Sequence, residues 1–174
     1  MAVGSGSKVP SNKVELFTSS TQWTATTDYP YHTSISRYTM IPFENSFVIL
    51  GGYTAASTHS TNLKIVNTVA SFNSIDSTWT NLGTLQKGRA SHSVIQLGED
   101  IFLVGGYSAK DSSSYSGYSS YSAYSSYSKE TEMEVCQIKK DTITCTLRQP
   151  SVSYGYYVGL AIVPQNFTPI STFG

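Results

Sequence analysis

The three histidines are the first residues of this chain to consider for metal binding or acid–base chemistry. His32, His59 and His92 stand far apart, and none lies at a metal-ligand spacing from another histidine or from a cysteine. We expect His92 to be held by packing at the start of a strand. No serine stands in a Gly-x-Ser-x-Gly turn, and no glycine-rich loop leads into a helix that would cradle a phosphate. These patterns predict neither a catalytic residue nor a metal or cofactor site.

Three glutamates near the C-terminal third form the most regular group of carboxylates. Glu130, Glu132 and Glu134 alternate along a stretch with strand character. Alternate residues of a strand share one face of the sheet. Because three like charges on one face are most simply hydrated, we interpret them as a solvent-exposed face rather than an acid–base pair.

The two cysteines flank a turn in the segment EVCQIKKDTITCTL. A two-residue turn at Lys140 and Asp141 would place Cys136 and Cys145 directly opposite each other in an antiparallel hairpin. A non-hydrogen-bonded pair of this kind suits a disulfide. We favour the bridge, and with it an extracellular setting, because cytosolic proteins rarely keep one. The alternative is a pair of buried free thiols that face one another.

Two further features bear on the compartment. Asn166 begins an Asn-Phe-Thr glycosylation sequon, although Pro169 follows it. The opening MAVGSGSKVPSNK has no apolar core and does not resemble a signal peptide. We therefore expect an extracellular or secreted protein on the strength of the cysteines, and a cytoplasmic location is the alternative.

Composition narrows the class of protein. At 174 residues the chain has the length of one domain. Its 11 Lys and Arg balance 11 Asp and Glu, so no basic field would attract nucleic acid. No segment approaches the ~18 apolar residues that a membrane helix needs. Abundant Ser, Thr and Tyr, together with absent helical periodicity, favour an all-β chain.

An internal repeat defines the elements that position these residues. SFVILGGY (46–53) and DIFLVGGY (100–107) match almost position for position. Residues 36–52 align without gaps to residues 90–106, and each stretch reads as two strands around a polar turn. The repeat is marked further by Gly51, Gly52, Gly105 and Gly106, by Trp23 and Trp79, and by equivalent strands at 14–17, 69–72 and 133–136.

Each unit therefore holds four short strands, with a glycine pair after the second and a tryptophan in the fourth. This pattern resembles the kelch repeat, whose units are β-propeller blades. The resemblance covers residues 13–165 and rests on VILGGY, FLVGGY, TWTNLGTLQKGR and the Arg89-x-x-His92 pattern before the next unit. It implies an all-β kelch-type propeller segment of four-stranded antiparallel blades, two of them complete (about 33–82 and 90–148) and the others partial.

The last unit departs from the pattern, because Cys145 stands near the tryptophan position and no glycine pair follows. A propeller also needs more blades than this chain holds. We interpret the chain as part of a larger propeller, and the alternative is that copies assemble to close a ring. We expect residues 1–12 to be a disordered N-terminus and 166–174 a tail. The expected core comprises Trp23, Trp79, Phe17, Ile49, Leu50, Phe72, Leu103 and Val104.

A Ser/Tyr-rich tract, residues 108–129, interrupts the second unit where the first has only residues 54–63. Its tyrosines recur at every third position, a period that fits neither a helix nor a strand. Loops of more than ~15 residues are usually functional or disordered. We interpret the tract as a disordered low-complexity insertion whose tyrosines stay out of the core. The alternative is a partner-binding loop that uses Tyr115, Tyr118, Tyr121, Tyr124 and Tyr127.

The kelch resemblance implies a non-catalytic module that binds a protein partner through the loops on one face. The residues do not identify that partner, and they indicate neither nucleic-acid binding nor membrane insertion. One alternative is a structural fragment with no independent function. Another is an enzyme of the copper-oxidase or sialidase kind, which would need a cluster of histidines and tyrosines supplied from loops.

Overall fold

A computed structural model describes residues 2–3, 11–17, 22–55, 63–109, 127–150 and 158–160. These residues form an all-β, antiparallel structure, and no helix occurs among them. No described segment is therefore a helix long and apolar enough to cross a membrane. Several expectations fall outside the described residues, namely those for His59, Tyr115, Tyr118, Tyr121, Tyr124 and Asn166 and for the tail 166–174.

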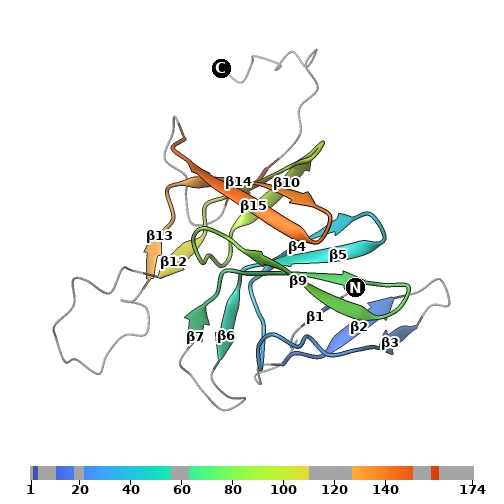
Figure 1. The fold of residues 1–174 in the computed structure, drawn as a ribbon. Coiled ribbons are helices and arrows are strands. Elements are labelled where there is room, and N and C mark those ends of the chain that lie inside the picture. The colour runs from blue at the N-terminus through green and yellow to red at the C-terminus, as the bar shows by residue number, and fades with distance from the viewer. Residues whose placement is uncertain are drawn as a thin grey trace, which may run out of the picture.

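Two four-stranded sheets correspond to the two complete repeats (Figure 1). The first has the order β4-β5-β8-β9, with strands Thr39–Phe43, Ser46–Leu50, Thr68–Asn73 and Thr78–Thr84. The second has the order β10-β11-β14-β15, with strands Ser93–Leu97, Asp100–Val104, Met133–Lys139 and Thr142–Arg148. The register repeats as well: Met40 pairs with Ile49 in the first sheet, and the equivalent residues Val94 and Leu103 pair in the second.

A third sheet lies at the N-terminal side, in the order β1-β2-β3. Its strands are Ala2–Val3, Val14–Phe17 and Trp23–Ala25. The expectation of a disordered segment over residues 1–12 is wrong for Ala2 and Val3, which pair with Glu15 and Val14. It is also wrong for Asn12, whose side-chain amide donates to the carbonyl of Tyr29 at 3.0 Å.

Two short hairpins extend from the middle of the two repeats, directly after the glycine pairs. β6 (Tyr53–Ala55) pairs with β7 (Leu63–Ile65). β12 (Tyr107–Ala109) pairs with β13 (Tyr127–Lys129). The expected loop 108–129 is thus wrong at both of its ends, where the chain is paired in a sheet.

The main core lies between the two four-stranded sheets. Val48 and Leu50 of β5 pack against Ile101 and Leu103 of β11, and all four side chains are buried. Each such side chain contributes about 1.5–3 kcal/mol by leaving water. A second cluster joins the first sheet to the N-terminal sheet and comprises Val14, Tyr29, Ile35, Ile49, Val66 and Ala70. The aliphatic residues and Phe72 that were expected to form the core are buried.

The two tryptophans differ. Trp79 packs on Phe72 and Tyr29, with ring centroids 4.9 and 5.1 Å apart, and its indole N–H donates to a backbone carbonyl. The expectation that Trp23 and Phe17 belong to the core is wrong, since they are 54% and 55% exposed. Side chains alternate along β2, so Val14 faces the neighbouring sheet and Phe17 turns away from it with Trp23, its pairing partner.

Candidate binding face at the link end of the strands

The strand connections divide between two ends of the molecule. At the turn end lie the tight turns 44–45, 74–77, 98–99 and 140–141. At the link end lie the glycine pairs, the hairpins β6–β7 and β12–β13, and the connections 26–38 and 85–92 that join one sheet to the next. Figure 1 shows the two hairpins projecting together on the side opposite the turns. The link end therefore carries the longer and more varied connections.

The glycine pairs allow these connections to pack closely. All four glycines have positive φ, from 59° at Gly51 to 111° at Gly52, a region that L side chains rarely adopt. A Cβ atom at Gly106 would lie 2.5 Å from the carbonyl oxygen of Ala90, and one at Gly51 would collide with the carbonyl oxygen of Arg89. The predicted role of the glycine pairs, a sharp turn with close backbone approach, is confirmed.

The two hairpins lie side by side and are joined by aromatic side chains. The ring of Tyr127 meets that of Tyr53 edge-on, with centroids 5.3 Å apart, and its hydroxyl donates to the carbonyl of Leu63. Ile65, Ala90 and Tyr107 belong to the same cluster. The expectation that the tyrosines of 108–129 stay out of the core is therefore wrong for Tyr127, because β13 pairing directs its ring onto the first hairpin.

A polar cavity of about 350 Å³ lies where the hairpins meet the connection 85–92. Its wall includes the side chains of Asn67, Gln86, Lys87, Ser108 and Ser128. The two serine hydroxyls are 3.3 Å apart. The cavity thus offers hydroxyl, amide and ammonium groups to a ligand that hydrogen-bonds.

Behind this cavity lies a buried ionic cluster that the sequence interpretation missed. The Arg89 guanidinium donates to the Glu134 carboxylate at 3.2 Å, and both side chains are fully buried. Lys87 contacts Glu132 and lies 3.8 Å from Glu130, which is 3% exposed. The expected solvent-exposed face is therefore wrong for Glu130 and Glu134, while Glu132 is half-buried and paired.

The pKa shifts of the cluster follow from its burial. Removal from water raises the pKa of the Glu134 carboxyl, against the opposing effects of the Gln86 backbone N–H and the Arg89 charge. The hydrogen bond that the Lys87 ammonium donates to the Glu132 carboxylate is the main cause that raises the pKa of Lys87. Arg89 also donates to the carbonyl of Glu132 at 3.2 Å, which fixes the start of β14 against the connection 85–92.

The first repeat has apolar residues where the second has this ion pair. Arg89 and Ile35 stand immediately before the aligned stretches 90–106 and 36–52, so they are equivalent positions. Glu134 pairs with Leu103 as Ala70 pairs with Ile49, so Glu134 and Ala70 are equivalent. Ile35 and Ala70 lie in one buried apolar cluster. The ion pair is therefore not required by the architecture of the repeat.

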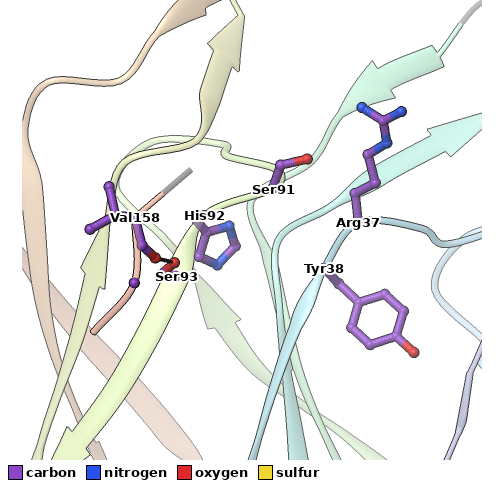
Figure 2. Close-up of a pocket in the computed structure, with 7 residues that line it drawn as sticks. Arg37, Tyr38, Ser91, His92, Ser93 and Val158 are labelled. Carbon is purple, nitrogen blue, oxygen red and sulfur yellow. Dashed lines mark hydrogen bonds between the residues drawn. The ribbon is translucent and has the colours of Figure 1, made fainter. Parts of the chain in front are cut away.

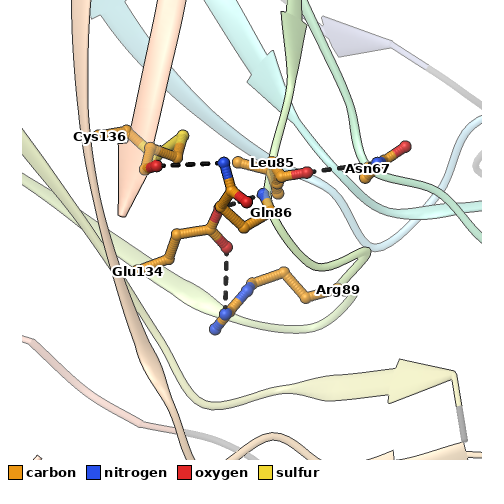
Figure 3. Close-up of a disulfide and its surroundings, with 7 residues drawn as sticks. Asn67, Leu85, Gln86, Arg89, Glu134 and Cys136 are labelled. Carbon is orange, nitrogen blue, oxygen red and sulfur yellow. Dashed lines mark hydrogen bonds and ion pairs between the residues drawn. A yellow bond between two sulfur atoms is a disulfide. The ribbon is translucent and has the colours of Figure 1, made fainter. Parts of the chain in front are cut away.

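The disulfide Cys136–Cys145 is present beside the cluster, and the predicted register holds from Lys139–Thr142 to the cysteine pair (Figure 3). The Gln86 amide donates to the carbonyl of Cys145 at 3.2 Å. Glu134 and the two sulfur atoms lie within 4.8 Å of one another, but sulfurs bonded to each other are not thiolate ligands for a metal. The bridge closes a short loop and stabilises the hairpin by about 2–3 kcal/mol in the chain-entropy model.

A second depression at the link end, the inner hollow, has a volume of about 460 Å³ (Figure 2). It lies between the starts of β4 and β10, the first edge strands of the two sheets. Its wall is formed by Arg37, Tyr38, Ser91, His92, Ser93, Val158 and Gly159. The Ser93 hydroxyl donates to the carbonyl of Val158, so Val158 and Gly159 border the hollow next to β10.

His92 is packed at the start of β10, as expected. It is 4% exposed, and its Nε2 lies 2.6 Å from the Thr39 hydroxyl. Its Nδ1 has no hydrogen-bond partner among the described residues. Burial, assisted by the Arg89 charge, lowers the pKa of His92 to about 3, so the ring is neutral. His32 lies elsewhere, with Nε2 at 2.9 Å from the Thr68 hydroxyl, so these two histidines form no shared site.

Comparisons with known proteins bear on the fold. No protein-family model matches the chain, and no curated protein matches it. Among solved structures 82 chains match. One of them, described as the structure of YjhT, is similar over 76% of this chain with a TM-score of 0.54 and 14% sequence identity. This chain spans 43% of that chain's length. At this identity the likeness shows a shared fold alone.

Proposed function

We propose that the chain is a segment of a kelch-type β-propeller that binds a protein partner, without catalysis, through its link end. The observation that carries the proposal is the pair of hairpins β6–β7 and β12–β13. Both extend from the same point of their repeats, and they pack side by side next to the polar cavity. A rigid β scaffold that presents unequal connections at one end is typical of binding modules.

The propeller assignment is supported by the repeated four-stranded sheets and their repeated backbone. Arg37 and Ser91, which are equivalent, have φ of 51° and 54°, and the equivalent turn residues Glu44 and Gly98 have φ of 52° and 62°. The likeness to the structure of YjhT agrees with this assignment at the level of fold. We propose that further blades, from additional sequence or a second copy, complete the ring.

We also propose an extracellular or secreted location. The Cys136–Cys145 disulfide supports it, because such bonds persist in oxidising compartments. The Asn166 sequon supports it as well, since glycosylation of that motif occurs in secreted proteins. Peptide mass spectrometry of secreted protein, with and without deglycosylation, tests the assignment: a free thiol at both cysteines and an unmodified Asn166 would contradict it.

Selection from an unbiased library of displayed peptides tests the binding function. Binders are titrated against the wild type, a link-end variant, Lys64→Ala, and a turn-end control, Lys140→Ala. Both lysines are exposed. We expect most binders to lose affinity on the link-end variant and to keep it on the control. Binders that map consistently to the turn end, or a selection that yields no specific binder, would contradict the proposal.

A further inference from the structure

Equivalent residues of the two repeats face one another across the inner hollow. Arg37 and Ser91 occupy the same repeat position with the same left-handed backbone, and Tyr38 is equivalent to His92. The backbone N–H of Ser91 donates to the carbonyl of Arg37 at 2.8 Å, which fixes the two connections together. Figure 2 shows that the Ser91 hydroxyl points toward the side of the hollow where Arg37 lies.

Arg37 is the charged group of this site and is available to a ligand. Its side chain is exposed, and no carboxylate of the described residues forms an ion pair with it. Its guanidinium carbon lies 5.8 Å from the ring centre of Tyr53, a contact that holds the side chain between the hollow and the first hairpin. A guanidinium held in this way presents a planar donor fork that suits a carboxylate.

Charge is distributed unequally between the two ends of the described structure. The turn end has five carboxylates and two lysines, namely Glu44, Asp76, Glu99, Asp100 and Asp141 against Lys139 and Lys140. The link end has seven basic residues and five carboxylates, namely Lys13, Arg37, Lys64, Lys87, Arg89, Lys129 and Arg148 against Glu15, Asp28, Glu130, Glu132 and Glu134. Three of these five carboxylates form the ionic cluster with Lys87 and Arg89, and Asp28 pairs with Lys13. The remaining charge at the link end is four basic residues against Glu15, and it is therefore mainly positive.

From these observations we infer that the inner hollow binds a carboxylate side chain of an acidic peptide segment of the partner, with Arg37 as its charged anchor. The Ser91 hydroxyl and the Tyr38 ring border the same space and complete the site. The inference rests on the proposed function and specifies the chemistry of the partner. A peptide fits better than a free acid, because Lys64 and Lys129 extend the positive surface along the hairpins, beyond the reach of one carboxylate.

The test uses a short acetylated and amidated peptide with three glutamates, and its glutamine counterpart, titrated by fluorescence polarisation. We expect the glutamate peptide to bind at least about tenfold more tightly, as charge-assisted bidentate contacts predict. Arg37→Gln should abolish this preference, whereas Lys140→Gln at the turn end should leave it unchanged. Thermal unfolding shows whether each variant is folded.

A gain-of-function variant keeps the test independent of folding defects. Ser91→Arg places at the second position the residue that the first repeat already holds on the same backbone, so we expect it to tighten the glutamate peptide several-fold. Equal affinity of both peptides for the wild type, or no response to either substitution, would overturn the carboxylate site. Glucuronate, a small free acid with one carboxylate, serves as a competitor. If it displaces the glutamate peptide as well as unlabelled peptide does at equal carboxylate concentration, the assignment of a peptide ligand is overturned.

These results separate the two proposals. If library-selected peptides bind at the link end but show no dependence on glutamate or on Arg37, the proposed function stands and the carboxylate site is wrong. If the glutamate peptide does not bind and the library yields no specific binder, the proposed function itself fails.

Discussion

The Arg89–Glu134 ion pair occupies positions that Ile35 and Ala70 hold in the first repeat. Because both charges are fully buried, their attraction must compensate for the loss of hydration of each. Such pairs are often no more stabilising than well-packed apolar residues, yet removal of one partner leaves a buried charge without compensation. The repeat provides a matched apolar replacement within the same chain.

We therefore expect Glu134→Ala to lower the free energy of unfolding by about 3–5 kcal/mol, because it leaves the Arg89 guanidinium buried without its carboxylate. The double variant Arg89→Ile with Glu134→Ala installs the residues of the first repeat and should recover most of this loss. Urea unfolding of both variants measures the difference. A double variant no more stable than Glu134→Ala would contradict this account of the cluster.

His92 gives a second prediction at this scale, since its pKa is about 3 in the folded protein against 6.5 for the unperturbed group. The unfolded chain takes up a proton that the folded chain does not, so stability falls as pH drops below 6.5. From His92 alone we expect a loss of about 2 kcal/mol by about pH 5.

The raised pKa of Glu134 acts in the opposite direction, because that carboxyl takes up its proton more readily in the folded protein. The His92 contribution is therefore measured as the difference in pH dependence between wild type and His92→Gln. A wild-type histidine resonance that titrates near pH 6.5 in the folded protein and belongs to His92 would contradict the prediction.

At the scale of elements, alternation and turn chemistry account for most of what the sequence predicted correctly. The two-residue turn at Lys140 and Asp141 determined the cysteine register, and the gapless alignment determined the first two strands of each repeat. The burial of Glu134 was predictable by the same alternation, because Glu134 shares its strand face with Cys136 and Ile138. The expectation of a solvent-exposed face follows from the charges of the three glutamates and does not account for these apolar neighbours, and for Glu134 it is wrong.

The partial sheet shows where such patterns fail. Trp23 aligns with Trp79, but burial of Trp79 depends on Tyr29, which reaches it from the connection between the N-terminal sheet and β4. Among the described residues no equivalent contact covers Trp23. A strand pattern contains no information about what packs on the outer face of the strand. The inner hollow was missed for a similar reason, since Arg37 and Ser91 meet through tertiary structure.

Because β12 pairs with β13, the effect of residues 110–126 on stability can be measured separately from that of Tyr127. Shortening residues 110–126 to the length of 56–62 should change the free energy of unfolding by less than about 1 kcal/mol, because loop closure costs roughly 0.6 kcal/mol per doubling of length. Tyr127→Ala should cost more, about 1–2 kcal/mol, since its half-buried ring packs on Tyr53.

Chemical denaturation of both variants measures the two effects. A loss of several kcal/mol on shortening, with Tyr127 retained, would show that the removed tract contributes to the core. An unchanged stability for Tyr127→Ala would instead contradict the packing of the second hairpin on the first.

At the scale of the whole molecule, the two ends of the strands differ in length of connection and in charge. The turn end has tight turns and a surplus of carboxylates, while the link end has hairpins, two depressions and exposed basic side chains. Composition predicted none of this, because 11 basic and 11 acidic residues cancel over the chain. The charges are separated in space because successive connections along the chain lie at opposite ends of the strands.

Hydrogen–deuterium exchange of the chain with and without a selected peptide tests the central claim, that the link end is the binding face. We predict that protection on binding is concentrated in β6–β7, β12–β13 and residues 35–38 and 85–92, with the turns 44–45, 74–77, 98–99 and 140–141 unchanged. Protection confined to those turns, or to the edge strands β3 and β9, would contradict the account.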